Sequence, residues 1–204
     1  MRLTYANILT LSRFFLAPVF MSFALVGTPQ SVTIGGILFA LAALSDWADG
    51  YLARKYHEVT EHGAYLDPLA DKVLTTSAFV TFYLLDIMPL WMVIVIIVRD
   101  FGITALRNLA EERGTPLETT YLAKVKTAVQ MIVITCVLTM YWLSVIDEGF
   151  VATSKFLEMQ DGVVNLLYSN AMWWLLFVLT LYTVATGIDY AARYRYLLRD
   201  PDVK

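Results

Sequence analysis

Long apolar runs constrain the fold of this chain more than any other feature of its sequence. Two of them read AVQMIVITCVLTMYWLSVI and AMWWLLFVLTLYTVATGI, and each approaches the roughly 18 to 20 apolar residues that a helix needs to cross a bilayer core. Hydrophobic residues make up 58% of the chain and charged residues 16%, whereas a soluble domain carries roughly a quarter charged residues. We therefore predict an all-α, polytopic membrane protein, with membrane lipid as its surroundings and no nucleic-acid partner.

Turn signals divide the chain into six predicted transmembrane helices. Their approximate ranges are 7–26, 33–56, 65–85, 89–110, 119–146 and 171–193. The polar stretch 147–170 is expected to be a connection, and no function follows from its residues. The single cysteine, Cys136, lies inside an apolar run, so no intrachain disulfide is possible.

Positive charge is distributed unevenly between the two sides of these six spans. Fourteen of the 15 Lys and Arg residues fall on one side, and only Lys155 falls on the other. Because cytoplasmic segments are enriched in Lys and Arg, both termini and the loops near 57–63 and 111–118 are predicted to be cytoplasmic.

Four aspartates interrupt the apolar sequence in the stretch SDWADGYLARKYHEVTEHGAYLDPLADK. They are Asp46, Asp49, Asp67 and Asp71. The second and third spans are expected to form a helical hairpin with its turn near residue 58, which puts Asp46 at about the depth of Asp71 and Asp49 at about the depth of Asp67. The spacing of three residues between Asp46 and Asp49, and of four between Asp67 and Asp71, puts the two aspartates of each helix on one face. We expect the four carboxylates to converge between the two helices, near their cytoplasmic ends.

Such a cluster of carboxylates requires compensation, because like charges near a low-dielectric region repel one another and are costly to desolvate. All-oxygen ligation favours Mg²⁺, Mn²⁺ or Ca²⁺. The alternative is that the aspartates are helix caps or solvated loop residues. Gly50, Ala53 and Gly63 leave room for a ligand or for helix packing, and Arg54 can face the same cleft and pair with a phosphate. Paired metals beside an arginine are typical of pyrophosphate chemistry.

The pattern Asp46-x-x-Asp49-Gly50-x-x-Ala53-Arg54, eight residues, Gly63-x-x-x-Asp67-x-x-x-Asp71 resembles the signature of the CDP-alcohol phosphotransferase family. The resemblance covers essentially the whole chain, so residues 1–204 are expected to form one transmembrane domain with six helices.

This resemblance implies a role for each signature residue. Asp46, Asp49 and Asp67 would ligate two divalent cations, Mg²⁺ or Mn²⁺, with Asp71 contributing to one of them. Asp71 would also act as general base on the acceptor hydroxyl, which attacks the β-phosphorus of a CDP-linked lipid and expels CMP. Gly50, Ala53 and Gly63 would border the cytidine pocket, and Arg54 would help to hold the nucleotide phosphates. A homodimer in the bacterial inner membrane, with its active site facing the cytoplasm, is also implied.

Cations in the later spans point to the acceptor. Arg99 and Arg107 lie about two turns apart on nearly the same helix face, and Lys124 and Lys126 begin the next span. Intramembrane cations are costly unless they face a polar cavity or a partner, so a phosphorylated acceptor would suit them. The alternative for Arg99 is an ion pair with Asp100 or with one of the signature aspartates.

The segments RDFGITALRNLAEERG, KVKTAVQM, NILTLSRFFLAPVF and TGIDYAARY are similar to those of the bacterial family members that make phosphatidylglycerophosphate. That similarity implies CDP-diacylglycerol as donor and sn-glycerol 3-phosphate as acceptor, with Arg107, Lys124, Lys126 and Arg99 binding the acceptor phosphate. Asn7, Thr10 and Arg13 either line the cleft entrance or cap the first helix.

Two other functions remain open at this point. The same chemistry could use another acceptor, such as inositol phosphate; serine is disfavoured by the cationic cleft. A protein of another class, a cation-coupled transporter, could also bind ions through intramembrane aspartates. Loss of CMP release in chelator would indicate the transferase, and ion flux without any nucleotide lipid would indicate the transporter.

Overall fold

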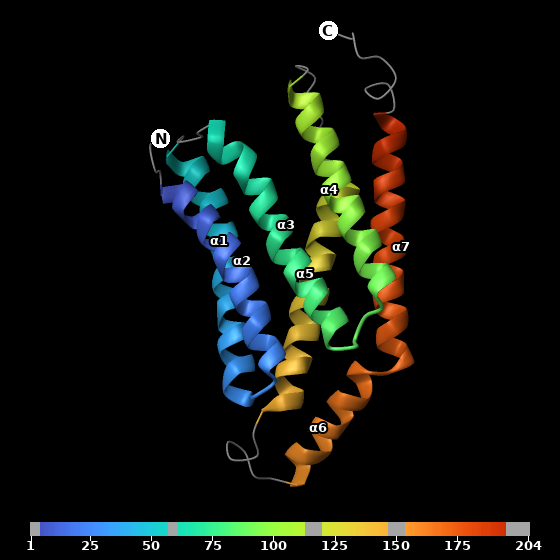
Figure 1. Cartoon of the computed structure of the whole chain (residues 1–204). Coiled ribbons are helices and arrows are strands. Elements are labelled where there is room, and N and C mark those ends of the chain that lie inside the picture. Colours follow the sequence, from blue (N-terminus) through green and yellow to red (C-terminus); the bar gives the residue numbers. More distant parts are fainter. Residues whose placement is uncertain (1–4, 57–60, 113–119, 147–153, 195–204) are drawn as a thin grey trace.

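The computed structural model describes residues 5–56, 61–112, 120–146 and 154–194, and within these ranges the chain is helical with no strand (Figure 1). The helices are α1 (Tyr5–Val26), α2 (Pro29–Tyr56), α3 (Glu61–Leu84), α4 (Leu90–Glu112), α5 (Tyr121–Val145), α6 (Ser154–Leu167) and α7 (Asn170–Arg193). Six of these are long, and their bounds agree with the six predicted helices to within a few residues.

The long helices run alternately up and down, so that α1 begins and α7 ends at the same end of the bundle (Figure 1). The end of α2 and the start of α3 also lie there, and we call it the signature end. The short helix α6 lies at the other end, called here the α6 end. By length and composition, α5 and α7 are candidate membrane spans, while α1 and α2 contain shorter apolar stretches at Ser12–Val26 and Pro29–Ser45.

The outer surface of the bundle carries many large apolar side chains. Phe15, Val98 and Ile188 are each more than 60% exposed. The interior is apolar too, and includes Phe79 and Phe82, whose rings meet edge to face.

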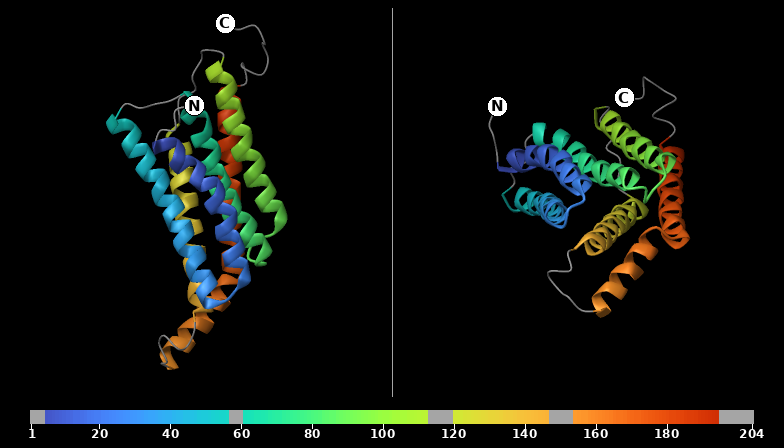
Figure 2. Two further views of the ribbon diagram at one scale, coloured as in Figure 1. Left: turned by 60° about the vertical axis from the view of Figure 1, so that its left-hand side comes forward. Right: turned by 60° about the horizontal axis from the view of Figure 1, so that its bottom comes forward.

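Helix α1 packs extensively against both α2 and α3, and these two pack far less on each other. Figure 2 shows α1 beside both of them. The close approach of α1 and α2 depends on Gly35, where a Cβ would lie 3.3 Å from the backbone N of Ala24 and the backbone O of Phe20. The expected hairpin of the second and third spans is therefore present in chain order, but α1 supplies most of its packing.

The connection between α1 and α2 is formed by a glycine turn and by side chains that cap the start of α2. Gly27 turns the chain with φ +73°, a conformation that glycine adopts without strain. Thr28 and Ser31 then exchange hydrogen bonds, since the Ser31 N–H donates to Thr28 Oγ1 at 3.3 Å and the Thr28 N–H donates to Ser31 Oγ at 3.1 Å. Such reciprocal bonds satisfy the free N–H groups at a helix start.

The stretch 147–170 connects α5 to α7, as expected, and contains the additional helix α6. Its Gln160 side chain donates to the backbone O of Ser144 at 3.0 Å and of Ile146 at 3.2 Å. Ser144 lies in the last turn of α5 and Ile146 directly follows it, and carbonyls at a helix end have no partner within the helix. Leu167 is buried in the core, so tertiary contacts stabilise this helix, which its polar sequence does not predict.

Candidate functional site

All eight signature residues lie in helices. Asp46 and Asp71 are each ten residues from the signature end, counted from Tyr56 back along α2 and from Glu61 forward along α3. Asp49 and Asp67 are seven and six residues from the same two helix ends. At about 1.5 Å per residue the members of each pair lie at similar depth along their helices.

The side chains of Asp46, Asp49, Asp67 and Asp71 lie outside the described residues, as do those of Gly50, Ala53, Arg54 and Gly63. Among the side chains that the structure does describe, no three His, Cys, Asp or Glu residues come together as a metal site. The predicted metal, nucleotide and base assignments therefore stay predictions.

A buried ionic cluster joins α4, α5 and α7. The Lys126 ammonium donates to Asp100 Oδ1 at 2.5 Å, and Arg99 Nη1 donates to the same oxygen at 3.0 Å. Gln130 Nε2 approaches Asp100 Oδ2 at 3.5 Å. The ion pair between Arg99 and Asp100, left open as an alternative by the sequence, is thus present, and the structure brings the predicted residues Arg99 and Lys126 together on one carboxylate.

Arg99 also connects this cluster to α7. Its Nη2 donates to Thr186 Oγ1 at 2.9 Å, and the Thr186 hydroxyl donates to the backbone O of Thr183 at 2.9 Å. The stem of Arg99 lies across Gly187, where a Cβ would come within 2.9 Å of Arg99 Cγ. Glycine at position 187 therefore makes room for the arginine.

Lys72 of α3 belongs to the same electrostatic environment, because its charge acts on both Asp100 and Lys126. It directly follows the signature residue Asp71 on α3. Sequence reasoning missed Lys72, Gln130 and Thr186 as site residues. The signal for Lys72 was its position beside Asp71; the other two are polar residues in apolar runs, with no distinguishing pattern.

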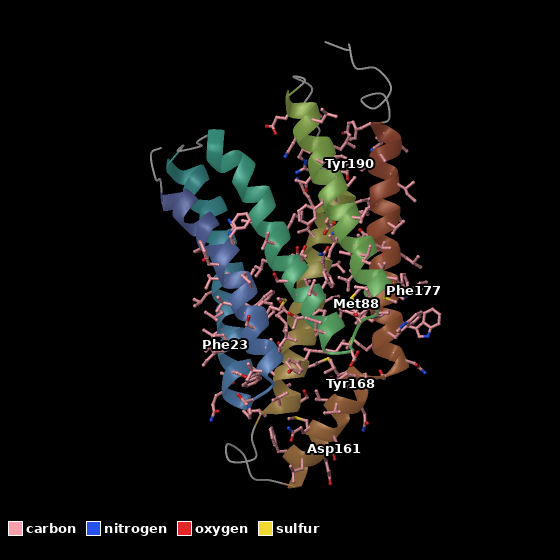
Figure 3. All side chains as sticks on the ribbon, in the orientation of Figure 1. Phe23, Met88, Asp161, Tyr168, Phe177 and Tyr190 are labelled. Atoms are coloured by element: carbon pink, nitrogen blue, oxygen red, sulfur yellow. The ribbon has the colours of Figure 1, made fainter. Side chains whose placement is uncertain are left out.

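Arg107 lies two turns beyond Arg99 on α4, and its Nε is buried without a hydrogen-bond partner among the described residues. The hydroxyl of Tyr190 on α7 is likewise buried and makes no hydrogen bond there. Tyr190 packs against Leu106 and Ala110 of α4, in the half of the bundle nearer the signature end, whereas Asp161 lies on α6 at the other end (Figure 3). Polar groups with unused hydrogen-bonding capacity thus accompany the cations.

Lys124 and Lys126 do not share a direction, although both were predicted to bind the acceptor phosphate. Lys124 is exposed and Lys126 is buried, because two residues turn an α-helix by about 200°. Arg13 is fully buried and lies well inside α1, so it does not cap that helix. The side chains of Asn7 and Thr10 lie outside the described residues.

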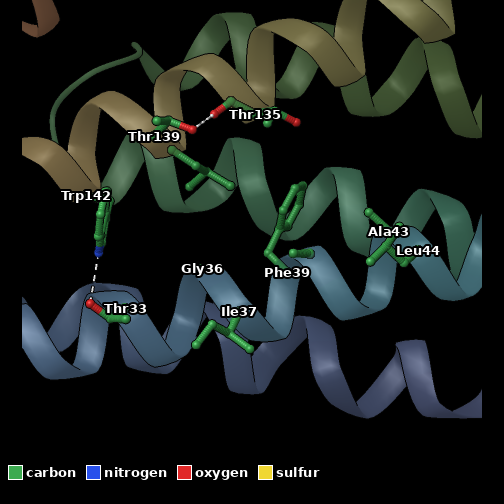
Figure 4. Close-up of a pocket in the computed structure, with 11 residues that line it drawn as sticks. Thr33, Gly36, Ile37, Phe39, Ala43, Leu44, Thr135, Thr139 and Trp142 are labelled. Atoms are coloured by element: carbon green, nitrogen blue, oxygen red, sulfur yellow. Dashed lines mark hydrogen bonds between the residues drawn. The ribbon is translucent and has the colours of Figure 1, made fainter.

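An apolar groove of about 610 Å³ runs between α2 and α5 (Figure 4). Small residues of α2, including Gly36 and Ala43, form one wall. The hydroxyl of Thr139 on the other wall donates to the backbone O of Thr135 at 2.8 Å, and Trp142 Nε1 donates to Thr33 Oγ1 at 2.8 Å. The polar atoms of the groove are therefore used internally, so that it presents mainly hydrocarbon. Along α2 the groove reaches Leu44, two residues before Asp46.

Comparison with known proteins connects these features to a family. The model of the CDP-alcohol phosphatidyltransferase family matches residues 3–184. The CDP-diacylglycerol–glycerol-3-phosphate 3-phosphatidyltransferase of Bacillus subtilis (strain 168) is 40% identical over 144 residues, covering 65% of this chain and 75% of that protein. The probable phosphatidylglycerophosphate synthase of Mycobacterium tuberculosis (strain ATCC 25618 / H37Rv) is 33% identical over 191 residues, covering 92% of this chain and 80% of that protein. With a family match over most of its length, this chain belongs to the CDP-alcohol phosphatidyltransferase family.

Proposed function

We propose that this protein transfers the phosphatidyl group of CDP-diacylglycerol to sn-glycerol 3-phosphate. The acceptor hydroxyl oxygen attacks the β-phosphorus of the donor and forms a new P–O bond. The bond from that phosphorus to the CMP oxygen breaks, CMP leaves, and the hydroxyl proton passes to a base. The products are phosphatidylglycerophosphate and CMP. Relatives with the corresponding names support this activity.

One structural observation carries the proposal for the acceptor: cations from several helices gather in the half of the bundle nearer the signature end. Lys72, Arg99, Arg107 and Lys126 come from α3, α4 and α5, and Asp100 is the one buried acidic side chain that the structure describes near them. Several cations in one region of the bundle suit a phosphorylated acceptor, because a phosphate accepts charge-assisted hydrogen bonds from Lys and Arg. We assign the acceptor phosphate to Arg99, Arg107 and Lys126, and we propose that exposed Lys124 attracts the anion toward the site.

The donor's pyrophosphate is assigned to the signature. Four carboxylates with all-oxygen donor atoms fit Mg²⁺ or Mn²⁺, and Asp46, Asp49, Asp67 and Asp71 would hold two such ions. Bound there, the ions would neutralise the pyrophosphate and stabilise the leaving CMP. Asp71 would accept the proton of the acceptor hydroxyl, Arg54 would contact the nucleotide phosphates, and Gly50, Ala53 and Gly63 would border the cytidine.

The donor's acyl chain is assigned to the groove between α2 and α5. The groove is lined mainly by hydrocarbon and its small residues leave space along α2. Its end at Leu44 is next to the signature, so a lipid whose head group is at Asp46 and Asp49 can place a chain in it.

The long helices α1, α2, α3, α4, α5 and α7 are proposed to be six membrane spans with both chain termini in the cytoplasm. The uneven distribution of Lys and Arg supports this orientation, and it would open the site to cytoplasmic glycerol 3-phosphate. We also propose a homodimer in the bacterial inner membrane, on the basis of the family resemblance.

CMP release by the purified protein tests the function directly. CDP-diacylglycerol and Mg²⁺ would be supplied with glycerol 3-phosphate, inositol phosphate or serine in separate reactions. We expect release with glycerol 3-phosphate, and its loss both in chelator and in the Asp71→Asn variant. Release with inositol phosphate alone would overturn the acceptor, and folded protein that releases no CMP but conducts ions in vesicles would favour the transporter.

A further inference from the structure

Asp100 is the only acidic side chain that is buried among those that the structure describes. Its two carboxylate oxygens receive hydrogen bonds from Lys126, Arg99 and Gln130. A buried carboxylate is stable only when it is paired and hydrogen-bonded, and here the partners come from its own helix and from α5.

Among the described side chains, the cluster around Asp100 has more positive than negative charge. One carboxylate pairs with two cations, Lys126 and Arg99. Hydrogen-bonding capacity also remains. Arg99 Nε and Arg107 Nε are buried without a partner among the described residues, and buried donors in this state are unusual in folded proteins. An anion with several acceptor oxygens would use both the surplus charge and the spare donors.

Asp100 holds the two longest side chains of this cluster in fixed directions. Lys126 is anchored to it from α5 and Arg99 from α4, while the other end of the Arg99 guanidinium is anchored to Thr186 on α7. Without the carboxylate, the two neighbouring cations would repel each other, and the Lys126 and Arg99 side chains both have many alternative rotamers.

We propose that Asp100 is a positioning residue that fixes Lys126 and Arg99 for the acceptor's phosphate, without contacting the acceptor itself. This inference rests on the proposed function for the identity of the anion. It differs from a purely structural ion pair in what it predicts. A structural pair would, when broken, lower the stability of the bundle and affect both substrates alike, whereas a positioning residue affects the acceptor selectively.

Steady-state CMP release by purified Asp100→Asn in detergent tests this. We expect the KM for glycerol 3-phosphate to rise at least tenfold while the KM for CDP-diacylglycerol stays within twofold, and Asp100→Glu to recover part of the acceptor KM. Asp189→Asn is the matched control, because it breaks an exposed ion pair with Arg193 one turn away on α7; both KM values should remain those of the wild type.

Three results would overturn the proposal: an acceptor KM within twofold of wild type, a lowered acceptor KM, or a parallel rise of both KM values. If Asp100→Asn does not fold, Asp100→Leu combined with Lys126→Met removes both charges together. This double variant should have a higher acceptor KM than Lys126→Met alone, because Arg99 then lacks its carboxylate anchor as well, while the KM for CDP-diacylglycerol stays within twofold of wild type. An acceptor KM equal to that of Lys126→Met alone would contradict the positioning of Arg99 by Asp100. Wild-type protein that releases no CMP with any phosphorylated acceptor would overturn the function as well, which separates the two failures.

Discussion

The two ends of the bundle both use polar side chains to join helices, but with different chemistry. At the α6 end the donors are neutral. Tyr141 donates its hydroxyl proton to the backbone O of Ala24 at 3.0 Å, and Trp142 donates to Thr33. The Gln160 amide serves the last carbonyls of α5. Each of these donors has an acceptor, and together they fix the geometry of the helix ends.

The contacts nearer the signature end are ionic, since Lys126 and Arg99 both pair with Asp100. Among the described residues, the buried Nε donors of Arg99 and Arg107 there have no hydrogen-bond acceptor. Leaving a buried polar group unsatisfied costs about 1–3 kcal/mol, so a chain optimised only for stability would not retain such a cluster. The comparison separates polar contacts that hold the fold from the ionic contacts that we propose bind a ligand, and variants at the two ends test this separation.

The largest effect is expected from Lys126→Met, which keeps an apolar stem and removes the buried ammonium. We expect the acceptor KM to rise at least tenfold, about 1.4 kcal/mol, measured by CMP release against glycerol 3-phosphate concentration. Lys124→Met on the same helix should cause only about a two- to threefold rise, reduced further by salt, because the exposed charge acts through solvent. Equal effects of the two substitutions would contradict the different roles assigned to these lysines.

Tyr141→Phe at the α6 end should have the opposite profile. The substitution removes the hydroxyl that serves the Ala24 carbonyl in the last turn of α1 and leaves that buried acceptor unsatisfied. We expect a loss of about 1 kcal/mol of unfolding free energy, seen as a lower thermal midpoint, with both KM values unchanged. A change in either KM would show that the two ends are not functionally separate.

The long helices were predictable because apolar length and turn residues such as Gly27 carry the signal. Their rotation about their own axes was not. Helices that are apolar on most sides have no stripe that says which face meets a neighbour, and this is why the opposite directions of Lys124 and Lys126 had to come from the structure. The approach of α1 to α2 at Gly35 is similarly a tertiary fact, since a glycine in an apolar run fits several packings.

The candidate site was predictable in part. Charges inside apolar runs are costly, so Arg99 and Lys126 were conspicuous, and Asp100 beside Arg99 suggested an ion pair. The sequence does not show that Asp100 also pairs with Lys126, because this contact joins two helices and depends on how α4 and α5 are rotated about their axes. Lys72 was overlooked because its distance from Asp100 along the chain hides their proximity.

Gly187→Ala tests the fit of Arg99 across α7. A Cβ at position 187 would lie 2.9 Å from Arg99 Cγ, so the arginine must shift and its bond to Thr186 should weaken. We expect roughly a threefold rise in the acceptor KM, equivalent to about 0.7 kcal/mol. Gly102→Ala is the control, because a Cβ there meets nothing within 4 Å. A similar rise in the control would attribute the effect to glycine loss rather than to Arg99.

Gln160→Ala should have the smallest effect and sharpens the comparison most. The amide serves the carbonyls of Ser144 and Ile146 at the end of α5, and it is only partly buried, so water can replace it there. We expect a loss of about 0.5 kcal/mol of unfolding free energy, at the low end for a hydrogen bond, with no change in either KM. Thermal unfolding and CMP release would be measured on the same preparation. A raised acceptor KM would mean that the position of α5, and with it Lys126, is set from the α6 end, so that the neutral contacts there would also act on the site.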